Sequence, residues 1–264
     1  MTRKKRARTM KMASPMSSDA LIEQTSADFW ALAGGTPGYP RAMQAAITLA
    51  APLELCPVVG LRVNHVLAWA RRINIACRIR GQDRCLHGCL VAWRGKGAIF
   101  YDTGDADDEQ RFTLAHELAH FLLDYEAPRE RAVTILGPSI LAVLDGERSP
   151  TVEERLHAVL SSVHLGVMSH LMERPEKGLP TSAILDVEDR ADRLALELLA
   201  PAQPLYELLD QPTAPRGFQA RLAFLSQQLT TSRGLPTDIA AAYARFLLAQ
   251  RGEPPFRDWL FGEI

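Results

Sequence analysis

A five-residue segment, His116-Glu117-Leu118-Ala119-His120, constrains this chain more than any other part of its sequence. On an α-helix, residues four apart lie one turn apart on the same face, so His116 and His120 can direct two imidazoles at one ion. Glu117 then lies beside that ion, where its carboxylate can act on a bound water. Peptide hydrolysis by zinc requires such an arrangement, so the segment predicts a protease site.

The residues around this segment predict that its helix is buried. Apolar side chains lie on nearly every side of it: Phe112, Leu114, Ala115, Leu118, Phe121, Leu122 and Leu123. Two imidazoles and a carboxylate inside such a helix are costly unless a partner satisfies them, and a metal ion would do so. Asp107 and Gln110 look like a capping box, which predicts a helix start about two turns before His116. The alternative is a buried helix with two hydrogen-bonded histidines and no metal.

A catalytic zinc ion takes a third protein ligand and keeps one position open for water. We expect Glu188 to be this ligand, because residues 186–201 have the pattern of a second amphipathic helix. Asp192 lies one turn after Glu188, where it can accept the free ring N–H of a liganding histidine. The alternative is a solvated acidic stripe that pairs with Arg190 and Arg193.

Together, the sequence around both helices resembles the ImmA/IrrE metallopeptidases, which are bacterial and phage enzymes of a compact thermolysin-like type. The matching motifs are Arg-Phe-Thr-Leu-Ala-His-Glu-Leu-Ala-His (111–120), Glu188-x-x-Ala191-Asp192 and Leu198-Leu199-Ala200-Pro201, within roughly 60–210. The resemblance implies that His116, His120 and Glu188 are the metal ligands. It implies that Glu117 is the catalytic glutamate. It also implies a protein substrate, since several members cleave a helix-turn-helix repressor and thereby switch on stress-response or mobile-element genes.

The expected fold class is α+β. Before the first motif we expect a helix over 64–72, strands over 73–80, 88–94 and 98–102, and a turn at 95–97. With the two motif-bearing helices, this small sheet would form a minimal zincin-like metallopeptidase core, and an edge strand of such a sheet often binds an extended substrate. We expect this domain to cover 21–210, after a disordered basic arm over 1–20.

A long insertion, 125–185, separates the two motif-bearing helices. We expect it to form a lid or docking surface over the cleft, because long connections between active-site elements often carry specificity. A helix is expected from about Thr151 to Arg174. We interpret its His157, His164 and His170 as solvated or core histidines, since a metal site there would need a further partner.

Residues 211–264 are expected to form a C-terminal helical region. Helices over 218–229 and 237–250 could make a helix-turn-helix unit. However, the segment that joins them is long for reading DNA, and the second helix carries only Arg245 as a basic residue. Phosphate binding normally demands more positive charge, so we favour a helical cap or a partner-binding module over DNA binding.

The composition agrees with a soluble enzyme in the cytoplasm. The chain of 264 residues is 47% hydrophobic with a net charge of −1, which shows no bias toward nucleic acid or acidic membranes. No apolar run suited to secretion follows the basic residues 3–8. We interpret the cysteines as reduced structural thiols, with Cys85-x-His87-x-Cys89 as an alternative metal or redox site.

The predicted function is a zinc metalloendopeptidase that holds one Zn²⁺ ion, with Mn²⁺ or another divalent metal as an alternative. Water activated by the metal attacks the peptide carbonyl, and Glu117 carries its proton to the leaving nitrogen. One further donor would help to hold the oxyanion, and Tyr125, Tyr206 and Tyr243 are candidates. Two other functions stay open: a non-catalytic zinc-containing regulator that binds DNA or a protein partner, and a metal-dependent hydrolase of non-peptide bonds.

Overall fold

The structure is a computed structural model that describes residues 18–161, 163–174 and 190–252. Residues 1–17 of the expected basic arm therefore lie outside the described residues. The described elements, in chain order, are α1 (Ser18–Leu32), α2 (Met43–Ala50), β1 (Leu53–Val58), α3 (Val63–Arg72), β2 (Leu86–Trp93), β3 (Lys96–Asp102), α4 (Asp107–His120), the π-helix η1 (Phe121–Glu126), α5 (Ala127–Leu136), the 3₁₀-helix η2 (Pro138–Ile140), α6 (Leu141–Leu144), α7 (Val152–Leu160), β4 (Met168–Glu173), α8 (Arg190–Leu199), α9 (Ala202–Leu209), α10 (Phe218–Gln227), the π-helix η4 (Gln228–Ser232) and α11 (Thr237–Gln250).

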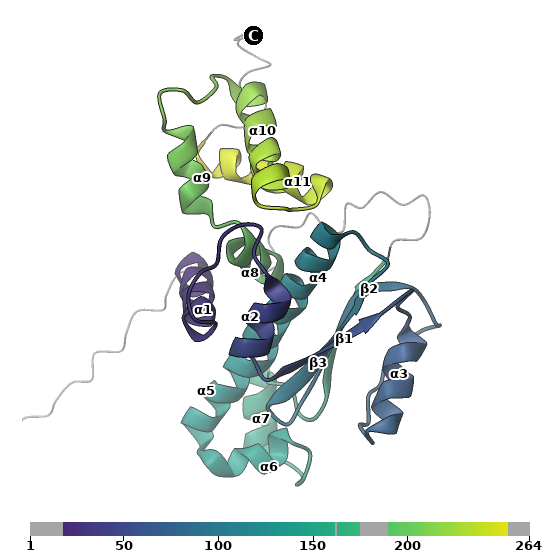
Figure 1. Ribbon diagram of the computed structural model, residues 1–264. Coiled ribbons are helices and arrows are strands. Elements are labelled where there is room, and N and C mark those ends of the chain that lie inside the picture. The colour runs from purple at the N-terminus through teal and green to yellow at the C-terminus, as the bar shows by residue number, and fades with distance from the viewer. Residues whose placement is uncertain (1–17, 162, 175–189, 253–264) are drawn as a thin grey trace, which may run out of the picture.

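A four-stranded mixed sheet lies beside the helix that carries the histidines (Figure 1). Its strand order is β1-β3-β2-β4, in which β1 runs parallel to β3 and β2 runs antiparallel to both neighbours. β2 and β3 form the hairpin expected from the sequence. Its two turn residues, Arg94 and Gly95, have φ of 49° and 75°, which suits the twist of a two-residue hairpin loop. β4 is left at an edge of the sheet.

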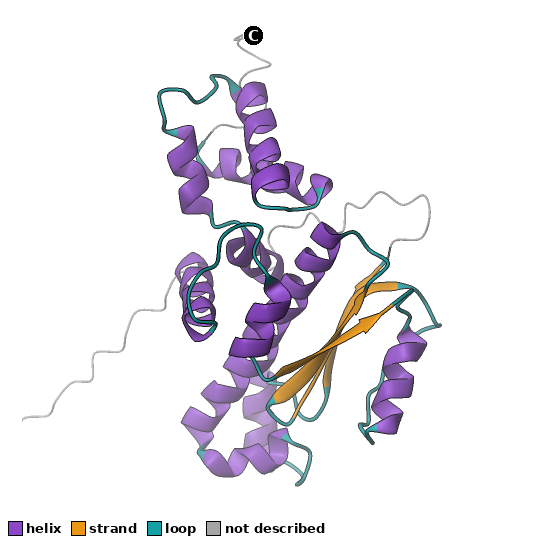
Figure 2. Ribbon diagram, viewed as in Figure 1, coloured by secondary structure: helices purple, strands orange, loops and turns teal. Residues whose placement is uncertain are grey.

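Helices cover both faces of the sheet (Figure 2). On one face α3 packs through residues such as Val66 and Trp69. On the other face lies α4, which also packs against α2 and α8. The side chains of β2 alternate between these two sides, so that Leu90 belongs to the core around α4 and Val91 to the core under α3. This arrangement confirms the α+β class.

α4 is a buried helix, as its sequence predicts. Every residue from Phe112 to His120 is buried. The expected capping box at Asp107 and Gln110, however, is wrong by one residue. The helix begins with Asp107 itself, and the carboxylate of Glu109 accepts a hydrogen bond from the backbone N–H of Ala106 at 3.2 Å. Gln110 donates instead to the carbonyl of Asp105 at 2.8 Å, because Glu109 takes the capping position at the start of the helix.

The strand expected over 73–80 is also wrong. α3 ends at Arg72, and Asn74 then takes a left-handed φ of 58°, which interrupts an extended chain. Ile75, Cys77 and Ile79 still pack against the core under α3. Among the described residues, however, the segment from 75 to 80 pairs with no strand. Apolar alternation thus predicted which side chains turn inward, but not whether the backbone joins the sheet.

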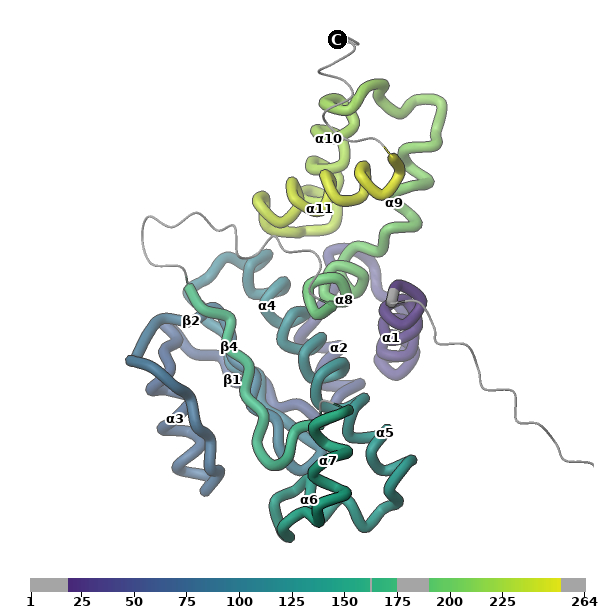
Figure 3. Tube along the Cα trace, turned by 180° about the vertical axis from the view of Figure 1, so that it is seen from behind, coloured from purple at the N-terminus to yellow at the C-terminus, as the bar shows by residue number. Residues whose placement is uncertain are grey.

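The helix expected over 151–174 is wrong in its second half. α7 ends at Leu160, and the chain turns through Gly166, with a φ of 87°, before it enters β4. Figure 3, viewed from behind, shows β4 on the near side of the sheet with α7 close to its beginning. His170 therefore lies on an edge strand that faces α4, rather than on a helix in the insertion.

The C-terminal helices α9, α10 and α11 lie together at the end of the molecule opposite α5, α6 and α7 (Figure 1). α10 with η4, and α11, agree with the helices expected over 218–229 and 237–250. Leu225 and Leu247 belong to the same hydrophobic cluster as α4. The domain limits at 210 and 211 stay a prediction. Within the described part of the chain, no helix combines the length and apolarity that a membrane crossing needs.

Candidate metal centre

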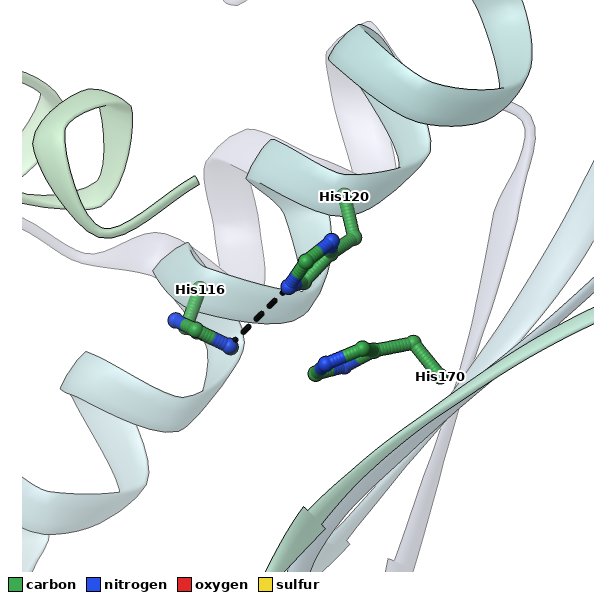
Figure 4. A group of neighbouring side chains, drawn as sticks. All are labelled: His116, His120 and His170. Carbon is green, nitrogen blue, oxygen red and sulfur yellow. Dashed lines mark hydrogen bonds between the residues drawn. The ribbon is translucent and has the colours of Figure 1, made fainter. Parts of the chain in front are cut away.

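The imidazoles of His116 and His120 point at each other across one turn of α4. Their Nε2 atoms lie 3.2 Å apart, and both residues are buried (Figure 4). Two nitrogens bound to one tetrahedral zinc ion at 2.0–2.1 Å would lie about 3.3 Å from each other. The spacing of the two rings therefore suits joint ligation of one ion.

Each of these rings is held from behind by a carboxylate. Nδ1 of His116 lies 2.8 Å from Oδ1 of Asp192 on α8, and Nδ1 of His120 lies 2.7 Å from Oδ2 of Asp124 on η1. When each Nδ1–H faces its carboxylate, both Nε2 atoms present lone pairs to the same point, where a cation would relieve their repulsion. The donor set thus fits a divalent metal ion.

The contact of Asp192 with His116 is the one its place in the sequence predicts, and its influence on metal binding stays a prediction. Asp124 was missed, although its spacing of four residues from His120 was a usable signal. Glu188, the expected third ligand, lies outside the described residues. Its role as a ligand therefore also stays a prediction.

Glu117 lies beside the two histidines and is fully buried, with 0% of its surface exposed. Burial alone raises the pKa of this carboxyl group, but His170, His116 and His120 together lower it below its ordinary value. Glu117 is therefore a buried carboxylate that stays ionised. Its Oε1 atom has no hydrogen-bond partner among the described residues, which leaves one acceptor free inside the site.

His170 reaches the same site from β4, which the residues around it did not predict. Its Nδ1 lies 3.0 Å from Oε2 of Glu117, and its ring stacks on that of His120 with centroids 3.5 Å apart. Ligand atoms of His116, His120 and His170 all lie within 4.8 Å of one another, so the three form a group that could hold a metal ion. The expectation of a solvated or core histidine is thus corrected. Because β4 was predicted as helix, its inward-facing residues could not be identified.

A cleft opens next to these side chains. It has a volume of about 510 Å³ and lies between η1, the start of α5, the end of α7 and β4. The residues that line it are His120, Leu123, Asp124, Pro128, Arg131, Leu160, Ser161, His164, Met168, Ser169, His170 and Arg190. The candidate metal centre is therefore accessible from the edge of the sheet.

The tyrosines considered as oxyanion donors lie elsewhere, and none of them lines this cleft in the described structure. The hydroxyl of Tyr243 donates to the carbonyl of Ala200 at 3.1 Å, and that of Tyr125 accepts from the N–H of Gly95 at 2.8 Å. Tyr206 lines a separate cavity between α1, α8, α9 and α11. The positions of these three tyrosines do not support their expected role as oxyanion donors.

Comparison with known protein families agrees with this geometry. Residues 87–137 match the Peptidase_M78 family, described as the IrrE N-terminal-like domain. The matched segment runs from β2 into the end of α5 and contains His116, Glu117 and His120. The match confirms, over this segment, the resemblance to these metallopeptidases found in the sequence. No curated protein and no solved structure matches the chain.

Proposed function

We propose that the protein is a zinc-dependent endopeptidase. The observation that carries this proposal is the convergence on one point of the two Nε2 atoms of His116 and His120, 3.2 Å apart, with the buried carboxylate of Glu117 beside them. Hydrogen-bonded core histidines would not need two carboxylates behind them and an ionised glutamate in front. A site that binds a metal ion and a water molecule needs all three of these carboxylates.

When bound, the ion supplies Lewis acidity that lowers the pKa of water toward ~7. His116 and His120 would hold it, with Glu188 as the proposed third ligand. Glu117 accepts the proton of the attacking water and passes it to the leaving nitrogen. Asp192 and Asp124 keep the two imidazoles in the orientation that directs Nε2 into the site.

The cleft and the sheet edge support a polypeptide substrate. β4 is an edge strand, and its Met168, Ser169 and His170 line the cleft beside His120. An extended peptide can add to such an edge through backbone hydrogen bonds, which would align its scissile bond with the histidines. The insertion from 125 to 185 contributes α7 to the same cleft and would take part in substrate choice.

Within this function, we propose a helix-turn-helix repressor as the substrate, cleaved in the cytoplasm. Family resemblance supports the proposal, since relatives of this type regulate transcription by such cleavage. The C-terminal helices would then bind a protein partner or cap the domain rather than bind DNA.

The test is to load the protein with Zn²⁺ and incubate it with a helix-turn-helix repressor encoded beside its gene. Fragments are then identified by mass spectrometry. Glu117→Gln should retain one metal ion per chain and lose at least about 10²-fold in turnover, the usual contribution of a general base. His116→Ala and His120→Ala should lose both metal and turnover.

Other outcomes would identify the alternatives. Stable binding of the repressor or of DNA without fragments, in a zinc-replete protein, would favour a non-catalytic regulator. Activity on small esters or amides, without cleavage of proteins, would favour a different hydrolase. Full turnover in metal-replete Glu117→Gln would reject Glu117 as the base.

A further inference from the structure

Three imidazoles and three carboxylates pair one to one in this site. His116 is paired with Asp192, His120 with Asp124, and His170 with Glu117. In the first two pairs the carboxylate holds a histidine that directs its other nitrogen into the site. The third pair is different, because its carboxylate is the group expected to take a proton. In this pair, the histidine holds the carboxylate in place.

The geometry of Glu117 shows what this contact achieves. A glutamate side chain has three rotatable bonds, so its two carboxylate oxygens need fixed neighbours to keep one orientation. Oε2 lies 3.0 Å from Nδ1 of His170. On the side of β2, Gly88 lies so close that a Cβ there would be 3.3 Å from Oε1. The carboxylate is therefore confined by two strands, and only Oε1 remains without a partner among the described residues.

The stacking of His170 on His120 distinguishes this role from metal ligation. Their ring planes are only 23° apart and the centroids are 3.5 Å apart. An imidazole lone pair lies in the plane of its ring, and two nearly parallel rings at this separation cannot both direct lone pairs at one ion at about 2.0–2.1 Å. As it lies, His170 is next to the ion position of His116 and His120 but turned toward Glu117.

We propose that His170 is a positioning residue for Glu117. It donates from Nδ1 to Oε2 and thereby leaves Oε1 directed at the attacking water. This role rests on the proposed peptidase function. His170 pairs through its backbone with Leu90 on β2, so the orientation of the base depends on the edge strand that borders the cleft.

This proposal can be tested with substitutions whose side-chain amide donates a hydrogen bond from the position of only one of the two ring nitrogens. The amide nitrogen of Asn can replace Nδ1, whereas that of Gln reaches the position of Nε2. With fluorescein-labelled casein as substrate, His170→Ala and His170→Gln should lower kcat on the order of 10²-fold, as expected when a reacting group is misplaced. KM should stay within about 2-fold, since the backbone of the edge strand, which would bind the peptide, is unchanged. His170→Asn should restore most of kcat.

Metal affinity separates positioning from ligation. In a chelator competition, His170→Ala should bind Zn²⁺ within about 2-fold of the wild type, because the two ligands of α4 keep their carboxylates. Affinity that falls by about 10-fold or more would show that His170 is a ligand and would overturn the proposal. So would equal activity of the Asn and Gln variants.

The contact can also be tested without any catalysis. In metal-free protein labelled with ¹⁵N-histidine, at a pH where His170 is neutral, NMR should show His170 with its proton on Nδ1. The His170 signal is identified by its absence in His170→Asn. In Glu117→Ala, which removes the acceptor, the ring proton of His170 should lie on Nε2 instead. If wild-type protein cleaves neither casein nor the repressor but the Nδ1–H tautomer is present, the proposed function fails while the contact stands. A proton on Nε2 in the wild type would refute the contact itself.

Discussion

Oδ2 of Asp124 lies 2.7 Å from Nδ1 of His120, one turn further along the same continuous helix. That turn is where α4 passes into the π-helix η1. Asp192 serves His116 in the same way from α8. One histidine is thus oriented from within its own helix and the other from a second helix. Packing of α8 on α4 is therefore needed for only one of the two.

Asp124→Ala should weaken zinc binding. Without the carboxylate, the His120 ring loses the partner that fixes its orientation and raises its basicity, which typically costs about 10–100-fold in metal affinity. Chelator competition at constant pH measures this change.

The matched control is Glu130→Ala, which removes an exposed acid on the next helix. It should change the affinity by less than about 2-fold, since exposed charges act weakly at a distance. Equal affinity in Asp124→Ala and the wild type would contradict the importance of this contact.

How far the sequence could predict this site depended on the range of each interaction. The relation between His116, Glu117 and His120 is fixed by the periodicity of one helix, so it could be predicted from spacing alone. The hairpin was equally local, because Gly95 marks the turn and the strands follow it directly.

Longer-range relations were harder to predict. His170 joins the site only because residues 168–173 form an edge strand beside β2. The apolar spacing in this region also suits a helix, and a short run cannot distinguish the two. The segment over 73–80 shows the opposite error, since inward-facing Ile75 and Ile79 gave a strand pattern where no pairing occurs among the described residues. Strand pairing is a tertiary property, and one chain's pattern does not fix it.

Gly88→Ala should destabilise the protein and disturb Glu117. A Cβ at this position would overlap Cγ2 of Thr113, a side chain of the buried helix α4. Forcing an additional methyl group into such a contact costs about 1–3 kcal/mol. Urea unfolding should show this loss.

A second substitution makes the prediction specific. Thr113→Ser removes the Cγ2 atom, so the double variant should recover most of the lost stability. Gly38→Ala is the control, because no heavy atom lies within 4 Å of a Cβ built there and its φ is not positive. If Gly38→Ala and Gly88→Ala had the same effect, the close approach of β2 to α4 would not be the cause.

The four cysteines should react with a thiol reagent in an order set by burial. Cys85 is exposed, Cys56 and Cys77 are half-buried, and Cys89 is buried. Burial raises the pKa of the Cys56 thiol to about 11 and that of Cys89 well above its ordinary value, so few thiolates form there. In native protein at about pH 8, one thiol should react fast with Ellman's reagent. Cys85→Ser should abolish that phase, and a fast phase that persists would contradict the assignment.

Protonation of Asp102 should contribute to unfolding in acid. Burial raises the pKa of this carboxyl group, but the N–H groups of Gly104, Gly60 and Leu61 and the guanidinium of Arg174 lower it further, so that it lies below its ordinary value. The unfolded chain therefore binds this proton first as the pH falls. The stabilisation is complete above the unfolded pKa, about 3.9, and is lost as the pH falls through the lower pKa of the folded state. Urea unfolding of zinc-free protein at about pH 7, about pH 4 and about pH 3 measures this loss. Asp102→Asn should be less stable than the wild type at neutral pH, and the difference should shrink at the lowest pH. A difference that stays constant over this range would show that the charge of Asp102 does not stabilise the end of the sheet.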